Sequence, residues 1–296
     1  MHPVDELLTP RHWLRYALAA FRRAGIHCGQ GTDNPWDEAV WLVHHALGLP
    51  PEGDVRLLDA PLSRDERLRI WALIDRRVRE RVPAAYLTGE AWFAGLPFTV
   101  DPRVIIPRSP IAELVERRFA PWLKREPRAI LDLCTGSGCI GIACAHAFPE
   151  ARVDLVDLCP DALAVAALNV ERHALGDRVR LVRSDLFAAL EGARYDLIVS
   201  NPPYVGEGEL ADLPPEFRHE PRLALAGGED GLALVRRILA EAPAHLEEGG
   251  LLVVEVGGSR PALEAAFPQL PFVWVEFERG GEGVFALQRE DLDALQ

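Results

Sequence analysis

The chain has 296 residues, of which 49% are hydrophobic and 26% charged, so we expect one large domain and one small domain rather than a disordered or fibrous chain. Its 45 acidic and 32 basic residues give a formal charge of −13, which disfavours binding to bare nucleic acid and favours a basic protein or a small molecule as partner. No apolar run approaches the ~20 residues needed to cross a bilayer, and the first residues lack the basic region followed by an apolar region that is typical of a signal peptide. We therefore expect a cytoplasmic protein. The five cysteines include no C-x-x-C pair, so small buried thiols are expected and no metal site.

Residues 1–85 predict a small bundle of three amphipathic helices. Apolar residues recur at helical spacing from Leu14 to Phe21, and a second helix is predicted between Asn34-Pro35 and Gly48. Ser63 and Glu66 have the spacing of a capping box for a third helix. The basic run at 76–81 in this helix is typical of a solvated face.

Residues 86–110 change to extended and aromatic sequence. Alternation about Gly95-Leu96-Pro97 predicts a β-hairpin. We expect this segment to link the helical bundle to the part of the chain that begins at residue 111.

Residues 111–296 alternate predicted helices and strands, which is typical of an α/β domain with a mainly parallel sheet. The pattern predicts helices over 111–122, 139–145, 162–174 and 232–246, and strands over 129–133, 153–157, 179–182, 195–199, 251–256, 272–277 and 283–287. The last two strands read as an antiparallel pair. These seven strands resemble the sheet of the class I methyltransferases, whose last strand runs antiparallel.

A glycine-rich loop follows the first of these strands. Gly136, Gly138 and Gly141 satisfy G-x-G-x-x-G at the start of a helix, where backbone N–H groups can face a ligand. Asp157 ends the next strand, about twenty residues on, at the spacing from which a carboxylate reaches a ribose diol. Both a nicotinamide dinucleotide and S-adenosylmethionine fit these positions.

Three further features favour S-adenosylmethionine. Asp132 lies just before the glycine loop, where methyltransferases often place an acid near the methionine amino group, and a carboxylate there is unfavourable beside a pyrophosphate. Asp185 follows the third strand, where it can accept from the adenine amino group while Leu186 packs near the ring. The third feature, the sequence at 201–204, has no use in hydride transfer.

Asn201-Pro202-Pro203-Tyr204 follows the fourth strand, at the sheet edge where ligands bind in α/β folds. Two prolines stiffen this loop and leave carbonyl groups without neighbouring N–H donors. The Asn201 side-chain oxygen and the Pro202 carbonyl can accept both hydrogens of a planar NH₂ group lying on the Tyr204 ring. Such a group is present in adenine and in glutamine.

This tetrapeptide is the N-P-P-Y signature of amino-methyltransferases, and nearly the whole chain resembles the glutamine N(5)-methyltransferase family of the translation apparatus. The shared features are the helical N-terminal part, Tyr86-Leu87-Thr88-Gly89-Glu90, Pro107-Arg108, the D-L-C-T-G-S-G loop, N-P-P-Y and Glu220-Pro221. The resemblance implies a substrate-recognition domain at 1–85, a hairpin linker at 86–110 and a methyltransferase domain at 111–296.

The resemblance also implies the site residues and the substrate. Catalysis is expected from Asn201, Pro202 and Tyr204, with Pro203 in the substrate site, and cofactor binding from Asp132, Thr135, Gly136, Gly138, Asp157, Asp185, Leu186 and Asn201. The segments at 91–98 and 104–114 look like the branch that methylates large-subunit ribosomal protein L3. We expect this basic protein to be the substrate before ribosome assembly. Two alternatives stay open: the glutamine of the GGQ motif in peptide release factors, and adenine in nucleic acid.

Overall fold

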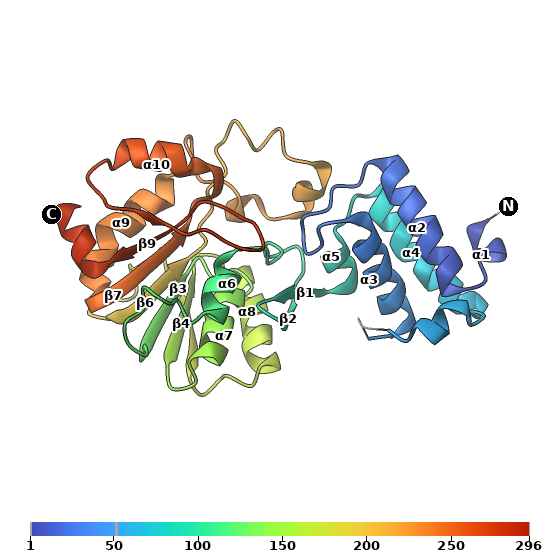
Figure 1. Cartoon of the computed structure of the whole chain (residues 1–296), viewed down its shortest axis with the longest axis horizontal. Coiled ribbons are helices and arrows are strands. Elements are labelled where there is room, and N and C mark those ends of the chain that lie inside the picture. The colour runs from blue at the N-terminus through green and yellow to red at the C-terminus, as the bar shows by residue number, and fades with distance from the viewer. Residues whose placement is uncertain (1, 51–52, 296) are drawn as a thin grey trace. The chain divides into compact units, whose positions relative to one another are not determined.

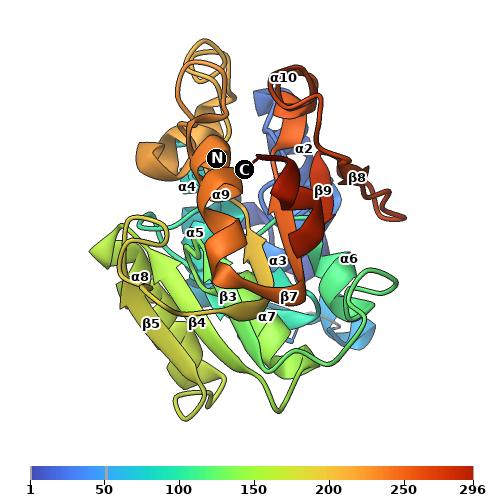
Figure 2. The same cartoon turned by 90° about the vertical axis from the view of Figure 1, so that its left-hand side faces the viewer.

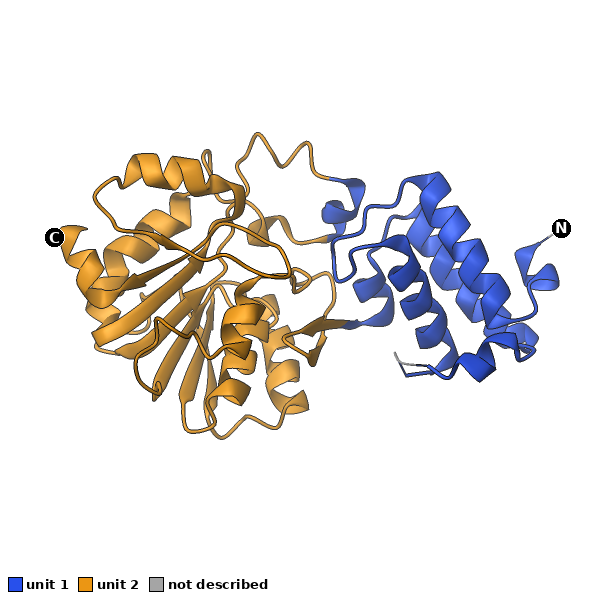
Figure 3. Ribbon diagram, in the orientation of Figure 1, with its two compact units in different colours: residues 1–90, 214–219 blue, residues 91–213, 220–296 orange. Residues whose placement is uncertain are grey.

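The computed structural model describes residues 2–50 and 53–295 and divides into two compact units (Figures 1 and 3). The first unit comprises residues 1–90 together with 214–219, and the second comprises 91–213 and 220–296. Among the described residues, no helix is both long enough and apolar enough to cross a bilayer.

The first unit is a helical bundle, as predicted. Its helices are α1 (Pro3–Glu6), α2 (Pro10–Ala24), α3 (Pro35–Leu47), α4 (Arg64–Arg79) and α5 (Ala84–Thr88), with 3₁₀ turns η1 (Val55–Asp59) and η2 (Pro215–His219). Asn34 caps α3 by accepting from two backbone N–H groups, and Gly48 ends it in the left-handed conformation. The predicted capping box of Ser63 and Glu66 is present at the start of α4.

The expectation that the basic run at 76–81 is a solvated face is wrong for Arg77. Its side chain is only 1% exposed and donates to Glu38 Oε1 at 3.0 Å and to Glu216 Oε1 at 3.2 Å. Arg77 also donates to the His27 carbonyl at 2.7 Å. The guanidinium is buried because two carboxylates inside the first unit supply the hydrogen bonds that water would otherwise make.

The second unit contains the predicted seven-stranded sheet, in the order β5-β4-β3-β6-β7-β9-β8. Its strands are β3 (Ala129–Leu133), β4 (Arg152–Asp157), β5 (Val179–Arg183), β6 (Tyr195–Ser200), β7 (Leu246–Glu255), β8 (Val273–Trp274) and β9 (Val284–Gln288). β3 pairs in parallel with β4 and β6, whereas β9 runs antiparallel to β7 and β8. β3 and β6 are therefore adjacent, and their carboxyl ends lie at one edge. The predicted hairpin is the two-stranded sheet of β1 (Glu90–Phe93) and β2 (Leu96–Thr99).

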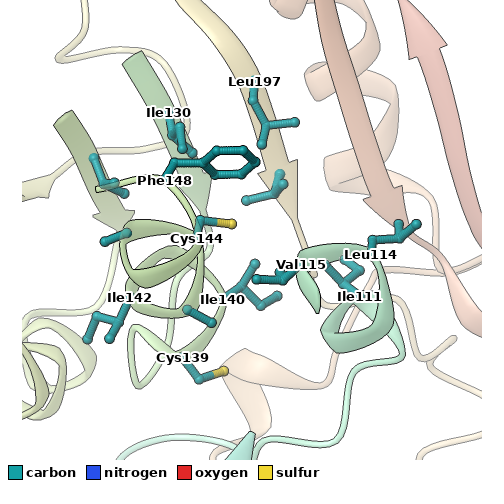
Figure 4. Packing of buried hydrophobic residues seen from close by; sticks show 14 of the residues in the cluster. Ile111, Leu114, Val115, Ile130, Cys139, Ile140, Ile142, Cys144, Phe148 and Leu197 are labelled. Atoms are coloured by element: carbon teal, nitrogen blue, oxygen red, sulfur yellow. The ribbon is translucent and has the colours of Figure 1, made fainter. Parts of the chain in front are cut away.

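Helices cover both faces of this sheet (Figure 2). On one face, α6 (Ile111–Glu116), α7 (Cys139–Ala147) and α8 (Pro160–Arg172) share a buried cluster with the sheet, part of which is drawn in Figure 4. On the other, α9 (Ala233–His245), α10 (Arg260–Ala266) and the 3₁₀ turn η5 (Arg289–Leu295) do the same. Successive strand residues such as Leu197 and Ile198 contribute to opposite clusters, because side chains alternate along a strand. Two short 3₁₀ turns, η3 (Arg222–Ala224) and η4 (Gly257–Ser259), complete the unit.

Two predictions about this unit's helices differ from the structure. The helix predicted over 111–122 ends at Glu116, because Arg118 and Phe119 adopt positive φ angles of 53° and 56° and Phe119 turns fully into the core. Helix α10 was not predicted. The five cysteines are free thiols, as expected, and Cys139 and Cys144 are buried, whereas the other three are only partly so.

Candidate active site

A cavity opens at the carboxyl ends of β3, β4 and β6, inside the second unit. About 600 Å³ of space lies between its walls, part of it open to solvent. The residues that line it are Arg103, Val104, Ile105, Cys134, Gly136, Asp157, Cys159, Ala162, Asn201, Pro203, Pro221, Leu223, Ala224 and Leu234. The cavity thus brings together Gly136, Asp157, Asn201 and Pro203 from the predicted site.

The glycine loop forms one wall of this cavity. Gly136 and Gly138 have positive φ angles of 55° and 82°, which a side chain would disfavour. A Cβ at Gly136 would meet no atom within 4 Å, so open space lies beside its backbone. A Cβ at Gly141 would lie 2.2 Å from Leu155 Cδ2, and the third glycine therefore permits close packing of α7 on β4.

Two backbone N–H groups of cavity-lining residues hold the Asp157 carboxylate. Its Oδ2 accepts from Gly136 N at 2.9 Å and its Oδ1 accepts from Cys159 N at 2.9 Å. Burial raises the pKa of Asp157, and the backbone hydrogen bonds oppose this shift. Each carboxylate oxygen keeps a lone pair, so the group can still accept from two hydroxyls.

Asp132 lies beneath the glycine loop and does not line the cavity. It is fully buried, and its Oδ2 accepts from Thr135 Oγ1 at 2.6 Å and from Gly141 N at 2.8 Å. Within the described part of the chain its Oδ1 has no hydrogen-bond partner. Burial raises the pKa of Asp132 to about 7. In this geometry Asp132 and Thr135 hold the loop, and their direct contact with a cofactor stays a prediction.

Asn201 directly follows β6 and lines the cavity. The preceding residue, Ser200, is buried and donates to the Leu133 carbonyl at 2.8 Å, which ties the ends of β6 and β3 together. In residues 2–50 and 53–295 the Asn201 side-chain amide has no protein hydrogen-bond partner. Pro203 also lines the cavity, whereas Pro202 is buried. An unpaired amide at this wall is available to bind a ligand.

Tyr204 is not among the cavity-lining residues. Its hydroxyl donates to Glu255 Oε1 at 2.8 Å, and burial raises its pKa well above the usual range. The predicted stacking of a substrate on its ring stays a prediction.

Asp185 and Leu186 do not line the cavity either. Asp185 is half exposed and accepts from Arg237 Nη1 at 2.8 Å. Leu186 is buried and has a positive φ of 49°. Their predicted contacts with adenine are not tested by this geometry.

The sequence reasoning missed two loop segments that line the cavity, at 103–105 and 221–224. Arg108 joins them: it donates to Glu220 Oε1 at 2.6 Å and to Oε2 at 2.9 Å, and Glu220 Oε1 also accepts from Ile106 N. The only signals for these loops were the pairs Pro107-Arg108 and Glu220-Pro221. Neither pair of residues indicates from the sequence that the two loops lie next to each other and line the same cavity.

The cavity residues fit S-adenosylmethionine. Open space beside Gly136 admits a ligand against the backbone, and Asp157 offers acceptors for a ribose diol. Ala162, Leu223 and Leu234 supply apolar surface in the same cavity.

Comparisons with known proteins agree with this fit. Residues 117–216 match the methyltransferase small domain, and residues 12–89 match the PrmC N-terminal domain. The chain is 53% identical over 292 residues to the ribosomal protein uL3 glutamine methyltransferase of Bordetella pertussis, covering 98% of both chains. It is 52% identical to the protein of the same name from Xylella fastidiosa, covering 98% of this chain and 93% of that one.

Among solved structures, the chain is similar to the hMettl16 catalytic domain in complex with MAT2A 3′UTR hairpin 6. The TM-score is 0.52 and the identity 18%, over 75% of this chain and 80% of that one. At this identity the likeness supports the methyltransferase fold alone.

Proposed function

Because this chain belongs to the family of ribosomal protein uL3 glutamine methyltransferases, we propose that it methylates the side-chain nitrogen N(5) of a glutamine in ribosomal protein L3 (uL3). The protein is an enzyme, and S-adenosyl-L-methionine is its methyl donor, supplying the methyl group from a sulfonium.

Within this proposal, the chain's own residues bind and orient the two reactants. The nitrogen of an amide is a weak nucleophile because its lone pair is delocalised. Asn201 Oδ1 and the Pro202 carbonyl accept the two amide hydrogens, which favours a tetrahedral nitrogen, and Tyr204 lies beside the amide plane. Holding both reactants in line is worth ~7–11 kcal/mol in favourable cases.

The observation that carries the proposal is the unpaired Asn201 amide in the same cavity as Gly136 and Asp157. A carboxylate for the ribose and an acceptor for the substrate amide thereby share one cavity. In the same proposal, Asp132 and Thr135 hold the glycine loop that contains Gly138. Asp185 accepts from the adenine amino group, and Leu186 packs near the adenine ring.

We further propose that the substrate is the free ribosomal protein, in the cytoplasm and before assembly. Ribosomal proteins are strongly basic, and a chain of charge −13 attracts a basic partner. The helical residues 1–85 are the proposed recognition domain, the hairpin at 86–110 is the proposed linker, and 111–296 is the proposed methyltransferase domain. Tight nucleic-acid binding is not expected.

The test is to incubate the purified chain with labelled S-adenosylmethionine and, in separate reactions, free uL3, a class 1 release factor and an RNA hairpin. We expect one methyl group on a single glutamine of uL3, located by peptide mass spectrometry. Label on the GGQ glutamine of the release factor instead would replace the proposed target. Label on adenine would overturn the amide chemistry.

A further inference from the structure

The buried carboxylate of Glu255 does not line the cavity but accepts hydrogen bonds from two segments that contribute to the cavity walls. Glu255 ends β7 and is 5% exposed. Its Oε1 accepts from the Tyr204 hydroxyl at 2.8 Å, and its Oε2 accepts from the Ser109 hydroxyl at 2.5 Å. These donors are 51 and 146 residues away in the sequence, so the arrangement exists only in the folded chain.

Three glycines pack closely against Tyr204, the residue that donates to Glu255. A Cβ at Gly257 would lie 2.6 Å from Tyr204 Cε2, which places the ring directly on the Gly257 backbone. Cβ atoms at Gly227 and Gly231 would lie 2.7 Å from Tyr204 Cα and 2.3 Å from its carbonyl oxygen. The tyrosine therefore has little freedom, and Glu255 fixes the polar end of its ring.

Ser109 connects the same carboxylate to a second wall. It follows Arg108, whose guanidinium binds Glu220, and the chain just before it contributes Arg103, Val104 and Ile105 to the cavity. Glu255 thus joins the loop at 201–204 to the segment at 103–109.

We propose that Glu255 is a positioning residue for methyl transfer: through Tyr204 and Ser109 it holds the Asn201 loop at the distance from the opposite wall that an amide substrate requires. This inference rests on the proposed function, because the oriented group is the glutamine amide. Glu255 does not touch the reactants, and its effect is transmitted by two hydroxyl groups.

The experiment compares Glu255→Ala with Glu255→Gln, and uses Glu264→Ala on the exposed face of α10 as the matched control. Glutamine keeps both contacts, because its carbonyl accepts from one hydroxyl and its NH₂ donates to the other. With free uL3 we expect Glu255→Ala to lower kcat about 10- to 100-fold, since displacements near 1 Å have effects of this size. We expect Glu255→Gln and Glu264→Ala to stay within about threefold of the unmodified protein.

A double-mutant cycle with Tyr204→Phe separates positioning from general stability. In the Tyr204→Phe background, Glu255→Ala should lower kcat by a smaller factor, because one of its two links is already lost. Additive effects, or equal losses for Glu255→Gln and Glu255→Ala, would overturn the proposal.

Hydrogen exchange tests the same idea without any substrate. We expect Glu255→Ala to speed amide exchange in a peptide spanning 200–206 and not in one from α2. Should uL3 prove not to be the substrate, this measurement still decides the positioning role; unchanged exchange at 200–206 would refute it.

Discussion

Replacing Asn201 by alanine should separate catalysis from stability. The side-chain amide has no hydrogen-bond partner among the described residues and lines an open cavity, so its removal leaves no buried group unpaired and no internal void. Changes of this kind usually alter the free energy of unfolding by no more than ~0.5 kcal/mol. Loss of one preorganised polar group at a reacting centre costs about 2.7–4 kcal/mol, or roughly 10²–10³ in kcat.

We therefore expect Asn201→Ala to lower kcat on uL3 at least about 100-fold, while the Kd for S-adenosylmethionine stays within about threefold. Steady-state kinetics, calorimetric titration and thermal unfolding measure the three quantities. Asn169→Ala is the contrasting variant, because Asn169 is buried and bonds Thr99 N, Thr99 O and the Ser137 carbonyl at 2.7–3.0 Å, so its unfolding temperature should fall. If Asn201→Ala methylated uL3 at nearly the normal rate, our assignment of the substrate amide to this loop would be refuted.

Asp157→Ala should weaken S-adenosylmethionine binding by ~1–3 kcal/mol, measured by calorimetry, because it leaves a ribose diol unpaired; unchanged affinity would exclude the role. The raised pKa of Asp132, about 7, means that the folded chain holds a proton that the unfolded chain releases near pH 4. Its stabilising contribution is therefore present below about pH 4 and is lost as pH rises to about 7, so Asp132→Asn should flatten the fall in unfolding temperature between pH 5 and 7. Arg77→Ala should destabilise by ~3–5 kcal/mol because it leaves buried carboxylates unpaired, whereas exposed Arg76→Ala should have little effect in urea unfolding. Association with uL3, followed by stopped flow, should slow as salt rises, and a rate independent of ionic strength would contradict charge attraction.

The sequence predicted those features that depend on neighbouring residues. Asn34, Pro35 and Gly48 mark both ends of α3 because caps act within one turn. The glycine loop and Asp157 were predicted from fixed spacing, and both lie at the cavity because parallel strands end at one edge.

The features that were missed depend on contacts distant in the sequence. Arg77 is buried because Glu216, 139 residues away, reaches it, and no local pattern indicates that pairing. The walls at 103–105 and 221–224 belong to loops, which have no periodicity to read. Glu255 fell inside the apolar strand predicted over 251–256 and was given no role, because neither hydroxyl that binds it is near it in the chain.

The membership of residues 214–219 in the helical unit limits how this protein can be divided. The chain leaves the second unit after residue 213, places Glu216 against Arg77 in the first unit, and returns to the second unit at Glu220, which binds Arg108. A cut after the hairpin would therefore separate Glu216 from Arg77 and leave residues 214–219, on the loop that follows Asn201, without the helices of their own unit. Exchange of the helical unit between relatives would need three junctions, after residues 90, 213 and 219, because the internal hexapeptide 214–219 must move with residues 1–90.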